Sequence, residues 1–149
     1  MSDGSLRGAL AVLAAAGTAV AGYVLWSRWS EDGLLCSTGG CETVQSSEYA
    51  VLLGAPVAAL GLVAYALIGI LVFRRGPAAR AAVAAIALAA LAFSAYLLVV
   101  QIVVVDALCN WCIANDVVAS LLAVFALLRV RGRDGATGIP AGSPALRRR

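Results

Sequence analysis

Four cysteines are the side chains in this sequence best suited to chemistry, and they fall into two close pairs. The second pair forms a CxxC motif, Cys109-Asn110-Trp111-Cys112. At the start of a helix, residues at i and i+3 share a face, so both sulfurs point the same way. The backbone N–H groups and the helix dipole there stabilise a thiolate. This pattern favours a redox pair that closes and reopens a disulfide.

The first pair, Cys36 and Cys41, lies in the loop sequence LLCSTGGC, whose glycines give it slack to move. Thiolates attack neighbouring disulfides, so two pairs side by side predict an electron relay. Two static structural disulfides are the first alternative, disfavoured because a CxxC ring is strained and a poor staple. A four-cysteine zinc site is the second, disfavoured by the loose spacing of the first pair and by the absence of histidine. No metal site is therefore expected.

Apolar segments must position these cysteines, because 62% of the 149 residues are hydrophobic and only 13% are charged. A membrane span needs about 20 mainly apolar residues. Four such runs are present, at 8–26, 51–73, 81–105 and 108–128. The sequence therefore predicts an all-α integral membrane protein with four transmembrane helices, inserted in the lipid bilayer. Repeated small residues, such as Gly17 and Ala21, favour a compact bundle because they let helices approach closely.

The distribution of charge predicts the orientation of the bundle. All eleven basic residues are arginines, and ten of them fall in segments that an even number of spans puts on one side. Positive residues favour the cytoplasmic side, so both termini are predicted there and the four cysteines on the outer face of the plasma membrane. The net charge of +3 is explained by this bias, and we expect no nucleic-acid partner. The predicted organisation is a cytoplasmic tail (1–7), a membrane domain (8–128) with an outer loop at about 29–50, and a disordered cytoplasmic tail (129–149).

Several short motifs occur in a specific order around the cysteines. CETVQSSEY begins at Cys41, LGAP follows at 53–56, GLVAY at 61–65, and the CxxC opens the last span. This order resembles the bacterial branch of the vitamin K epoxide reductase (VKOR) family over residues 8 to 128. The resemblance implies a four-helix bundle around a quinone, of the menaquinone or ubiquinone type. It also implies a short half-helix in the outer loop that caps the site.

The same resemblance implies a function in disulfide-bond formation. In that function a DsbA-like thioredoxin-fold partner is reoxidised and a membrane quinone is reduced; here the partner is expected to be a separate protein. Cys109 and Cys112 resemble the quinone-proximal pair, Cys41 the loop cysteine that exchanges with Cys109, and Cys36 its outer mate. Cys112 lies deeper than Cys109 and is expected to reduce the quinone. Ser47 resembles a serine that hydrogen-bonds near the quinone, although capping a helix is an equal alternative.

Asp116 departs from the family pattern, because animal members carry a tyrosine at this position. An ionisable side chain inside a span is expensive and usually functional. It lies four residues after Cys112, on the same helix face, and is expected beside the quinone, where its carboxyl would relay a proton. The alternative is a structural hydrogen bond to a neighbouring helix. Trp111, Phe93 and Tyr96 are candidate walls of the quinone site on composition alone.

Three other functions compete with this interpretation. Reduction of vitamin K epoxide is the activity of animal members. A non-catalytic membrane scaffold with disulfide-braced loops would need a larger outer loop than this one. The DsbB family uses four helices and two cysteine pairs, but there the CxxC comes early in the chain, whereas here it comes late.

Overall fold

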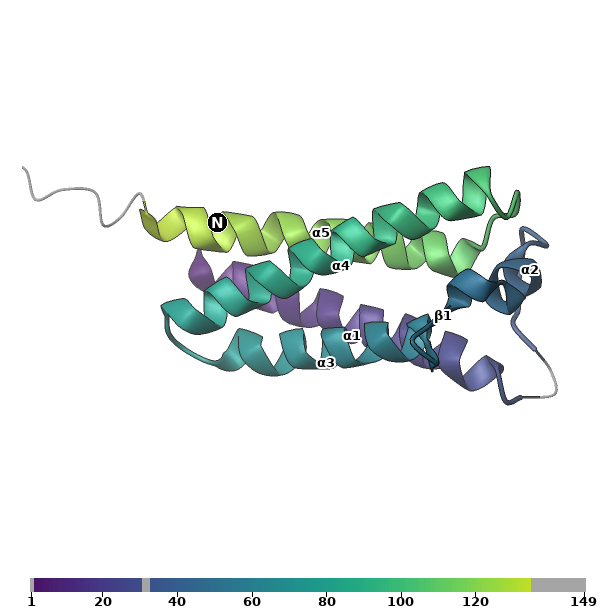
Figure 1. Cartoon of the computed structure of the whole chain (residues 1–149). Coiled ribbons are helices and arrows are strands. Elements are labelled where there is room, and N and C mark those ends of the chain that lie inside the picture. The colour runs from purple at the N-terminus through teal and green to yellow at the C-terminus, as the bar shows by residue number, and fades with distance from the viewer. Residues whose placement is uncertain (1, 31–32, 135–149) are drawn as a thin grey trace, which may run out of the picture.

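Four long helices form an antiparallel bundle in the computed structural model, which describes residues 2–30 and 33–134. They are α1 (Asp3–Ser27), α3 (Val57–Phe73), α4 (Pro77–Val103) and α5 (Asn110–Asp134). Figure 1 shows them side by side, with the chain running up and down the bundle. Helix α1 packs against α3 and α5, and α4 packs against the same two helices. The prediction of an all-α four-helix bundle is confirmed.

The outer surface of the bundle is apolar. Val12 of α1, Val63 of α3, Val99 of α4 and Val124 of α5 each expose more than half of their surface. Water would make such exposure unfavourable on every helix, whereas lipid does not. Helices α1, α4 and α5 are long and apolar enough to cross a membrane, and α3 is a shorter apolar helix. The protein is therefore a multi-pass membrane protein.

The interior of the bundle is filled by small and branched side chains from all four helices. The ring of Tyr65 packs directly on the backbone of α1 at Gly17. A Cβ atom at Gly17 would lie 2.6 Å from this ring, which is closer than real Cβ contacts allow. Gly17 therefore sets how closely α1 and α3 approach, as the pattern of small residues indicated.

Both ends of the helical region extend further than the sequence predicted. Helix α1 begins at Asp3, because the Ser2 hydroxyl caps it by accepting a hydrogen bond from the Ser5 N–H. Residues 3–7 are therefore helix instead of tail. At the other end α5 continues from the predicted limit at Leu128 to Asp134. The rest of the predicted C-terminal tail, 135–149, lies outside the described residues.

The connection between α1 and α3 contains the predicted short half-helix. This helix is α2 (Cys41–Ser46), and a 3-10 turn, η1 (Glu48–Ala50), follows it. The predicted start of the second span at Val51 is wrong. Strands β1 (Val51–Leu52) and β2 (Ala55–Pro56) pair there as a small antiparallel hairpin. Gly54 at the turn has a φ of 82°, and Pro56 fixes the chain immediately before α3. Apolarity alone could not distinguish this hairpin from a helix.

Candidate functional site

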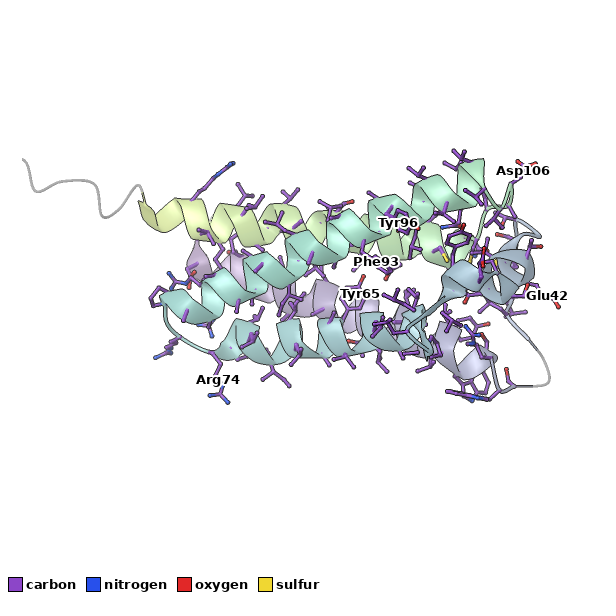
Figure 2. The ribbon with its side chains drawn as sticks, viewed as in Figure 1. Glu42, Tyr65, Arg74, Phe93, Tyr96 and Asp106 are labelled. Atoms are coloured by element: carbon purple, nitrogen blue, oxygen red, sulfur yellow. A yellow bond between two sulfur atoms is a disulfide. The ribbon has the colours of Figure 1, made fainter. Side chains whose placement is uncertain are left out.

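All four cysteines lie in one cluster at the end of the bundle that α2 covers. Cys36 and Cys41 form a disulfide, whereas Cys109 and Cys112 are free thiols. Together with Val44 they pack into a single apolar cluster. In Figure 2 the yellow sulfur atoms gather between α2 and the start of α5. The fold thus brings one disulfide and one dithiol together from segments about seventy residues apart in sequence.

The four sulfurs differ in their access to solvent. Cys41 and Cys109 are completely buried, whereas Cys36 and Cys112 are partly exposed. Cys36 lies on the loop side of the cluster, where its sulfur also contacts the Thr38 hydroxyl at 3.3 Å. Cys112 lines a cavity between the helices. The buried sulfurs therefore lie between one that faces the loop surface and one that faces the interior.

Cys109 occupies the last position before α5, where it is held in place by α4. Its backbone N–H donates to Gln101 Oε1 at 3.1 Å. A hydrogen bond from Cys112, helped by the backbone N–H groups of Cys112 and Trp111, lowers the pKa of Cys109 from 9.0 to about 6. Burial acts in the opposite direction but is the weaker effect. Cys109 is thus the thiolate of the pair at neutral pH.

We expect the Cys109 thiolate to be present above about pH 6 and to be lost as the pH falls through that value. Ultraviolet thiolate absorbance during a pH titration measures this, with Cys109→Ser as the blank. Cys112→Ala removes the hydrogen bond, so the titration should move upward toward the ordinary thiol range. Cys112→Ser keeps a hydroxyl donor and should move it less. Equal titrations for the two variants would contradict the assigned cause.

Asn110, the second residue of the CxxC, connects the two pairs. Its Oδ1 lies 3.2 Å from Cys36 Sγ and 3.0 Å from Cys41 Sγ. A carboxamide can accept from a thiol, or turn over and donate an N–H to a thiolate. The Cys41 backbone N–H also donates to Cys36 Sγ at 3.2 Å. Asn110 was not predicted as a site residue, because only its position within the CxxC pointed to it.

Gly40 lets the loop approach the CxxC segment closely. A Cβ atom there would lie 2.6 Å from the Leu108 carbonyl oxygen and 2.8 Å from the Leu108 nitrogen. These are backbone atoms, which cannot move aside as a flexible side chain can. The contact is reinforced by the Thr38 hydroxyl, which donates to the same carbonyl oxygen at 2.7 Å.

We expect Gly40→Ala to push Cys41 away from Cys109 and to slow exchange between the pairs about tenfold or more, because misplacing reacting atoms by about 1 Å is costly. The measurement is the rate at which a reduced loop pair is reoxidised by an oxidised CxxC pair. Gly39→Ala is the matched control, because it adds a methyl group to the same loop without a steric clash: nothing lies within 4 Å of a Cβ at Gly39. The φ of 76° at Gly39 adds backbone strain to this control. A larger effect at Gly39 than at Gly40 would contradict the steric argument.

Below the cysteine cluster lies a cavity of about 450 Å³ bounded by all four long helices and the α2–β1 region. Its walls are largely aliphatic and aromatic, as in pockets that hold apolar ligands. Cys112 is the only one of the four cysteines that lines it. Polar residues on its wall include Gln45, Ser47, Tyr65, Ser94, Asn115 and Asp116.

Four polar side chains of the cavity form two hydrogen-bonded pairs between helices. The Ser94 hydroxyl donates to Asp116 Oδ1, and the Tyr65 hydroxyl donates to Asn115 Oδ1 at 2.6 Å. Asp116 Oδ2 is buried and has no hydrogen-bond partner among the described residues. A buried acceptor oxygen without a hydrogen bond lowers the stability of the fold unless a ligand or a water molecule donates to it.

The sequence profile of the vitamin K epoxide reductase family matches residues 9–127 of this chain. The chain belongs to the VKOR family. No individual curated protein matches the sequence. Together with its membrane helices and the Cys36–Cys41 disulfide, membership makes this VKOR protein a membrane thiol–disulfide oxidoreductase.

Among the remaining residues expected at this VKOR site, Ser47 and Trp111 both line the cavity. The Ser47 hydroxyl donates to the Val44 carbonyl oxygen at 2.7 Å, and it makes no capping bond to the turn that follows. Trp111 also anchors the loop, since its Nε1–H donates to the Leu35 carbonyl oxygen at 2.6 Å. Its ring centroid lies 4.6 Å from that of Tyr23.

Of the two aromatic candidates on α4, only one lies in the cavity wall. Phe93 lines the cavity. Tyr96 is 52% exposed and stacks on Phe93 from outside, with ring centroids 6.2 Å apart. Their labels in Figure 2 mark these positions. Tyr96 is not among the residues that line the cavity, so the expectation that it forms a wall there is wrong.

Gln45 is a further cavity residue of this VKOR protein that sequence analysis did not single out. Its Nε2 donates to Cys112 Sγ at 3.7 Å. It lies within the CETVQSSEY motif, but only the fold shows that α2 lays this side chain against the CxxC. Among the described residues, no three His, Cys, Asp or Glu side chains converge as a metal site.

Proposed function

We propose that this protein oxidises a thioredoxin-fold partner of the DsbA type and passes the electrons to a membrane quinone. One observation carries the proposal: a disulfide and a dithiol share one cluster, and one thiol of the dithiol, Cys112, also lines an apolar cavity among the membrane helices. This arrangement corresponds to one stage of a relay. The loop pair is oxidised and ready for a partner, and the CxxC pair holds the electrons.

The first step takes place at the loop disulfide. A partner thiolate attacks Cys36, the accessible sulfur of the loop pair, and the Cys36–Cys41 bond breaks. Cys41 leaves as a thiolate beside the Asn110 carboxamide. The second partner thiol then displaces Cys36, so the partner leaves as a disulfide and the loop pair is a dithiol. Two electrons have entered the loop pair.

The second step moves these electrons inward, once Cys109 and Cys112 have been oxidised to a disulfide. The Cys41 thiolate attacks Cys109, with which it shares the buried cluster, and Cys112 leaves as a thiolate. Cys36 then attacks Cys41, the loop disulfide forms again and Cys109 is released. The CxxC pair is now a dithiol, and the relay has returned to the stage seen in the structure.

The cavity residues suit a quinone of the menaquinone or ubiquinone type. An apolar volume of about 450 Å³ fits a ring with part of its tail. Gln45, Ser47 and Asp116 offer polar atoms to the ring oxygens, and Cys112 supplies the nearest sulfur. A bound quinone accepts two electrons and two protons. The unpartnered Oδ2 of Asp116 is the chain's own group for holding a proton at this place.

The decisive assay is quinone-dependent reoxidation of a reduced thioredoxin-fold protein by the purified chain. We expect Cys36→Ala and Cys41→Ala to abolish it, because the relay has no redundant sulfur. We expect dithiothreitol, a small thiol, to bypass the loop pair, so both variants should still reduce quinone with dithiothreitol. Parental turnover of the protein partner by either variant would refute the relay. Vitamin K epoxide in place of quinone tests the alternative substrate in the same assay.

We further propose that the cysteine end faces outward across the plasma membrane and that both termini are cytoplasmic. Figure 2 shows Glu42 and Asp106 at one end of the bundle and Arg74 at the other. This separation of charge supports the positive-inside orientation. A membrane-impermeant thiol reagent applied to intact cells, after reduction of the disulfide, should label Cys36. Labelling only after the cells are broken would reverse the orientation.

A further inference from the structure

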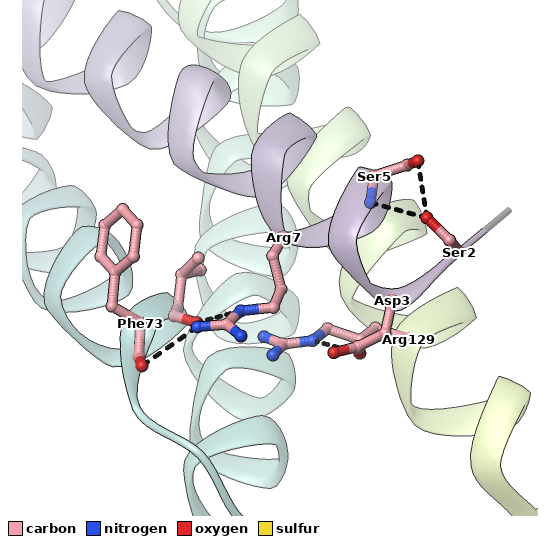
Figure 3. Close-up of polar contacts among 7 residues, drawn as sticks. Ser2, Asp3, Ser5, Arg7, Phe73 and Arg129 are labelled. Atoms are coloured by element: carbon pink, nitrogen blue, oxygen red, sulfur yellow. Dashed lines mark hydrogen bonds and ion pairs between the residues drawn. The ribbon is translucent and has the colours of Figure 1, made fainter.

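Three arginines from three helices converge at the end of the bundle opposite the cysteines. They are Arg7 of α1, Arg80 of α4 and Arg129 of α5, and the charges of all three act on Asp3. Arg7 donates through Nε and Nη2 to the carbonyl oxygens of Val72 and Phe73, at 3.2 and 3.1 Å. Figure 3 shows the guanidinium groups of Arg7 and Arg129 extending toward each other.

This cluster, Arg7, Arg80 and Arg129, has more positive charge and more donors than its surroundings satisfy. Among the side chains that the structure describes, Asp3 is the only carboxylate bonded to it, through Arg129 Nε at 3.2 Å, and the Asp3 side chain is 46% exposed. Arg129 is only 4% exposed. Arg129 Nη1 and Arg80 Nε are buried and lack a hydrogen-bond partner among the described residues.

A buried guanidinium N–H without a hydrogen-bond acceptor, close to other positive charges, is unfavourable. An anion bound between the guanidinium groups would accept the hydrogen bond and offset the repulsion. Arginine presents its donors as a planar fork that matches the oxygens of a phosphate. The cluster lies where α1 and α5 reach the end of the bundle, which is the level of lipid headgroups. The unpaired donors, the planar geometry of arginine and the position at headgroup level together favour a phosphate group as the anion.

We propose that Arg7, Arg80 and Arg129 form a binding site for a phosphate group, provided by the headgroup of an anionic lipid or by free phosphate. Arg129 Nη1 and Arg80 Nε donate to the phosphate oxygens, and Arg7 contributes charge while it stays bonded to the end of α3. A bound phosphate joins α1, α4 and α5 at this end. The site is distant from the cysteines and does not depend on the proposed redox function.

The test uses the purified full-length chain in neutral detergent, with added phosphatidylglycerol, phosphatidylcholine or inorganic phosphate. A ligand that binds the folded state raises the unfolding temperature. We expect phosphatidylglycerol to do so and phosphatidylcholine not to. Arg80→Gln and Arg129→Gln should each weaken phosphatidylglycerol binding about tenfold, the scale of one charge-assisted hydrogen bond. Native mass spectrometry counts the retained lipid.

Arg131→Gln is the matched control, because Arg131 is exposed on the same helix as Arg129. It should bind phosphatidylglycerol as the parent does. If Arg129→Gln does not fold, the binding of phosphatidylglycerol to Arg80→Gln tests the site. A shift with inorganic phosphate that Arg80→Gln removes would support the site and assign it to free phosphate. Equal losses in Arg80→Gln and Arg131→Gln, or no shift with either phosphate source, would overturn the proposal.

Discussion

Cys112→Ser should stop quinone-dependent oxidation of a protein partner, to below about one-thousandth of the parental rate, as expected when a nucleophile of a concerted set is removed. The reason is the position of Cys112, which is the only cysteine that lines the cavity. Without its thiol, Cys112 can no longer attack Cys109 to release Cys41, so only Cys36 remains to resolve a bond between Cys41 and Cys109. The variant should therefore accumulate a Cys41–Cys109 disulfide when it is oxidised, which peptide mass spectrometry after non-reducing digestion would detect.

The identity of the trapped bond tests the order of the relay. Cys41 and Cys109 are both buried in the same cluster, whereas Cys36 lies toward the loop surface. A Cys36–Cys109 disulfide in the trapped variant would reverse the assignment of the loop cysteines. The double variant Cys41→Ser, Cys112→Ser is the control, because it lacks the expected partner sulfur and should show no such crosslink.

Asp116→Asn should lower the rate of quinone reduction about 100-fold, the lower end of what general acid–base catalysis contributes. The carboxamide keeps the shape of the side chain and can still bond to the Ser94 hydroxyl, but it cannot release and take up a proton. The measurement is the rate of quinone reduction with dithiothreitol as donor, which bypasses the loop pair. Thermal unfolding of the variant should match that of the parent.

Asp106→Asn is the control, since this exposed carboxyl lies outside the cavity in the α4–α5 connection. An Asp116→Asn rate equal to the parental rate from about pH 6 to pH 9 would leave Asp116 with only a structural role. If the variant can no longer form a disulfide between Cys109 and Cys112, the fall in rate has another cause, and Asp116 is again left with only a structural role.

The sequence predicted the parts of this protein that depend on local chemistry and on composition. Cysteine spacing identified the two pairs, and apolar runs identified four helices. The spacing of Cys112 and Asp116 placed both on one helix face, and both line the cavity. These predictions succeed because helical periodicity and transfer to lipid are properties of short segments.

Contacts between distant segments could not be predicted in this way. Gln45 reaches Cys112 across 67 positions of the chain, and nothing near Gln45 indicates its partner. The start of α3 was misplaced because Val51 and Leu52 are as apolar as helix residues, while the turn at Gly54 and the proline after it decide the hairpin. Arg80 and Arg129 contribute to the charge count, but their convergence appears only in the folded bundle.

Because α3 begins late in the chain, it is much shorter than the helix α4 that packs against it. With 17 residues, α3 rises about 26 Å, whereas α4 with 27 residues rises about 40 Å. A hydrocarbon core of about 30 Å is therefore too thick for α3. The β1–β2 hairpin comes immediately before α3, and Leu53 at its tip is 99% exposed. Leu52 of the same hairpin lines the cavity, so a thicker bilayer should strain this wall. Quinone reduction should then depend on lipid chain length, and a constant rate from short to long acyl chains would show that the hairpin moves independently of the site.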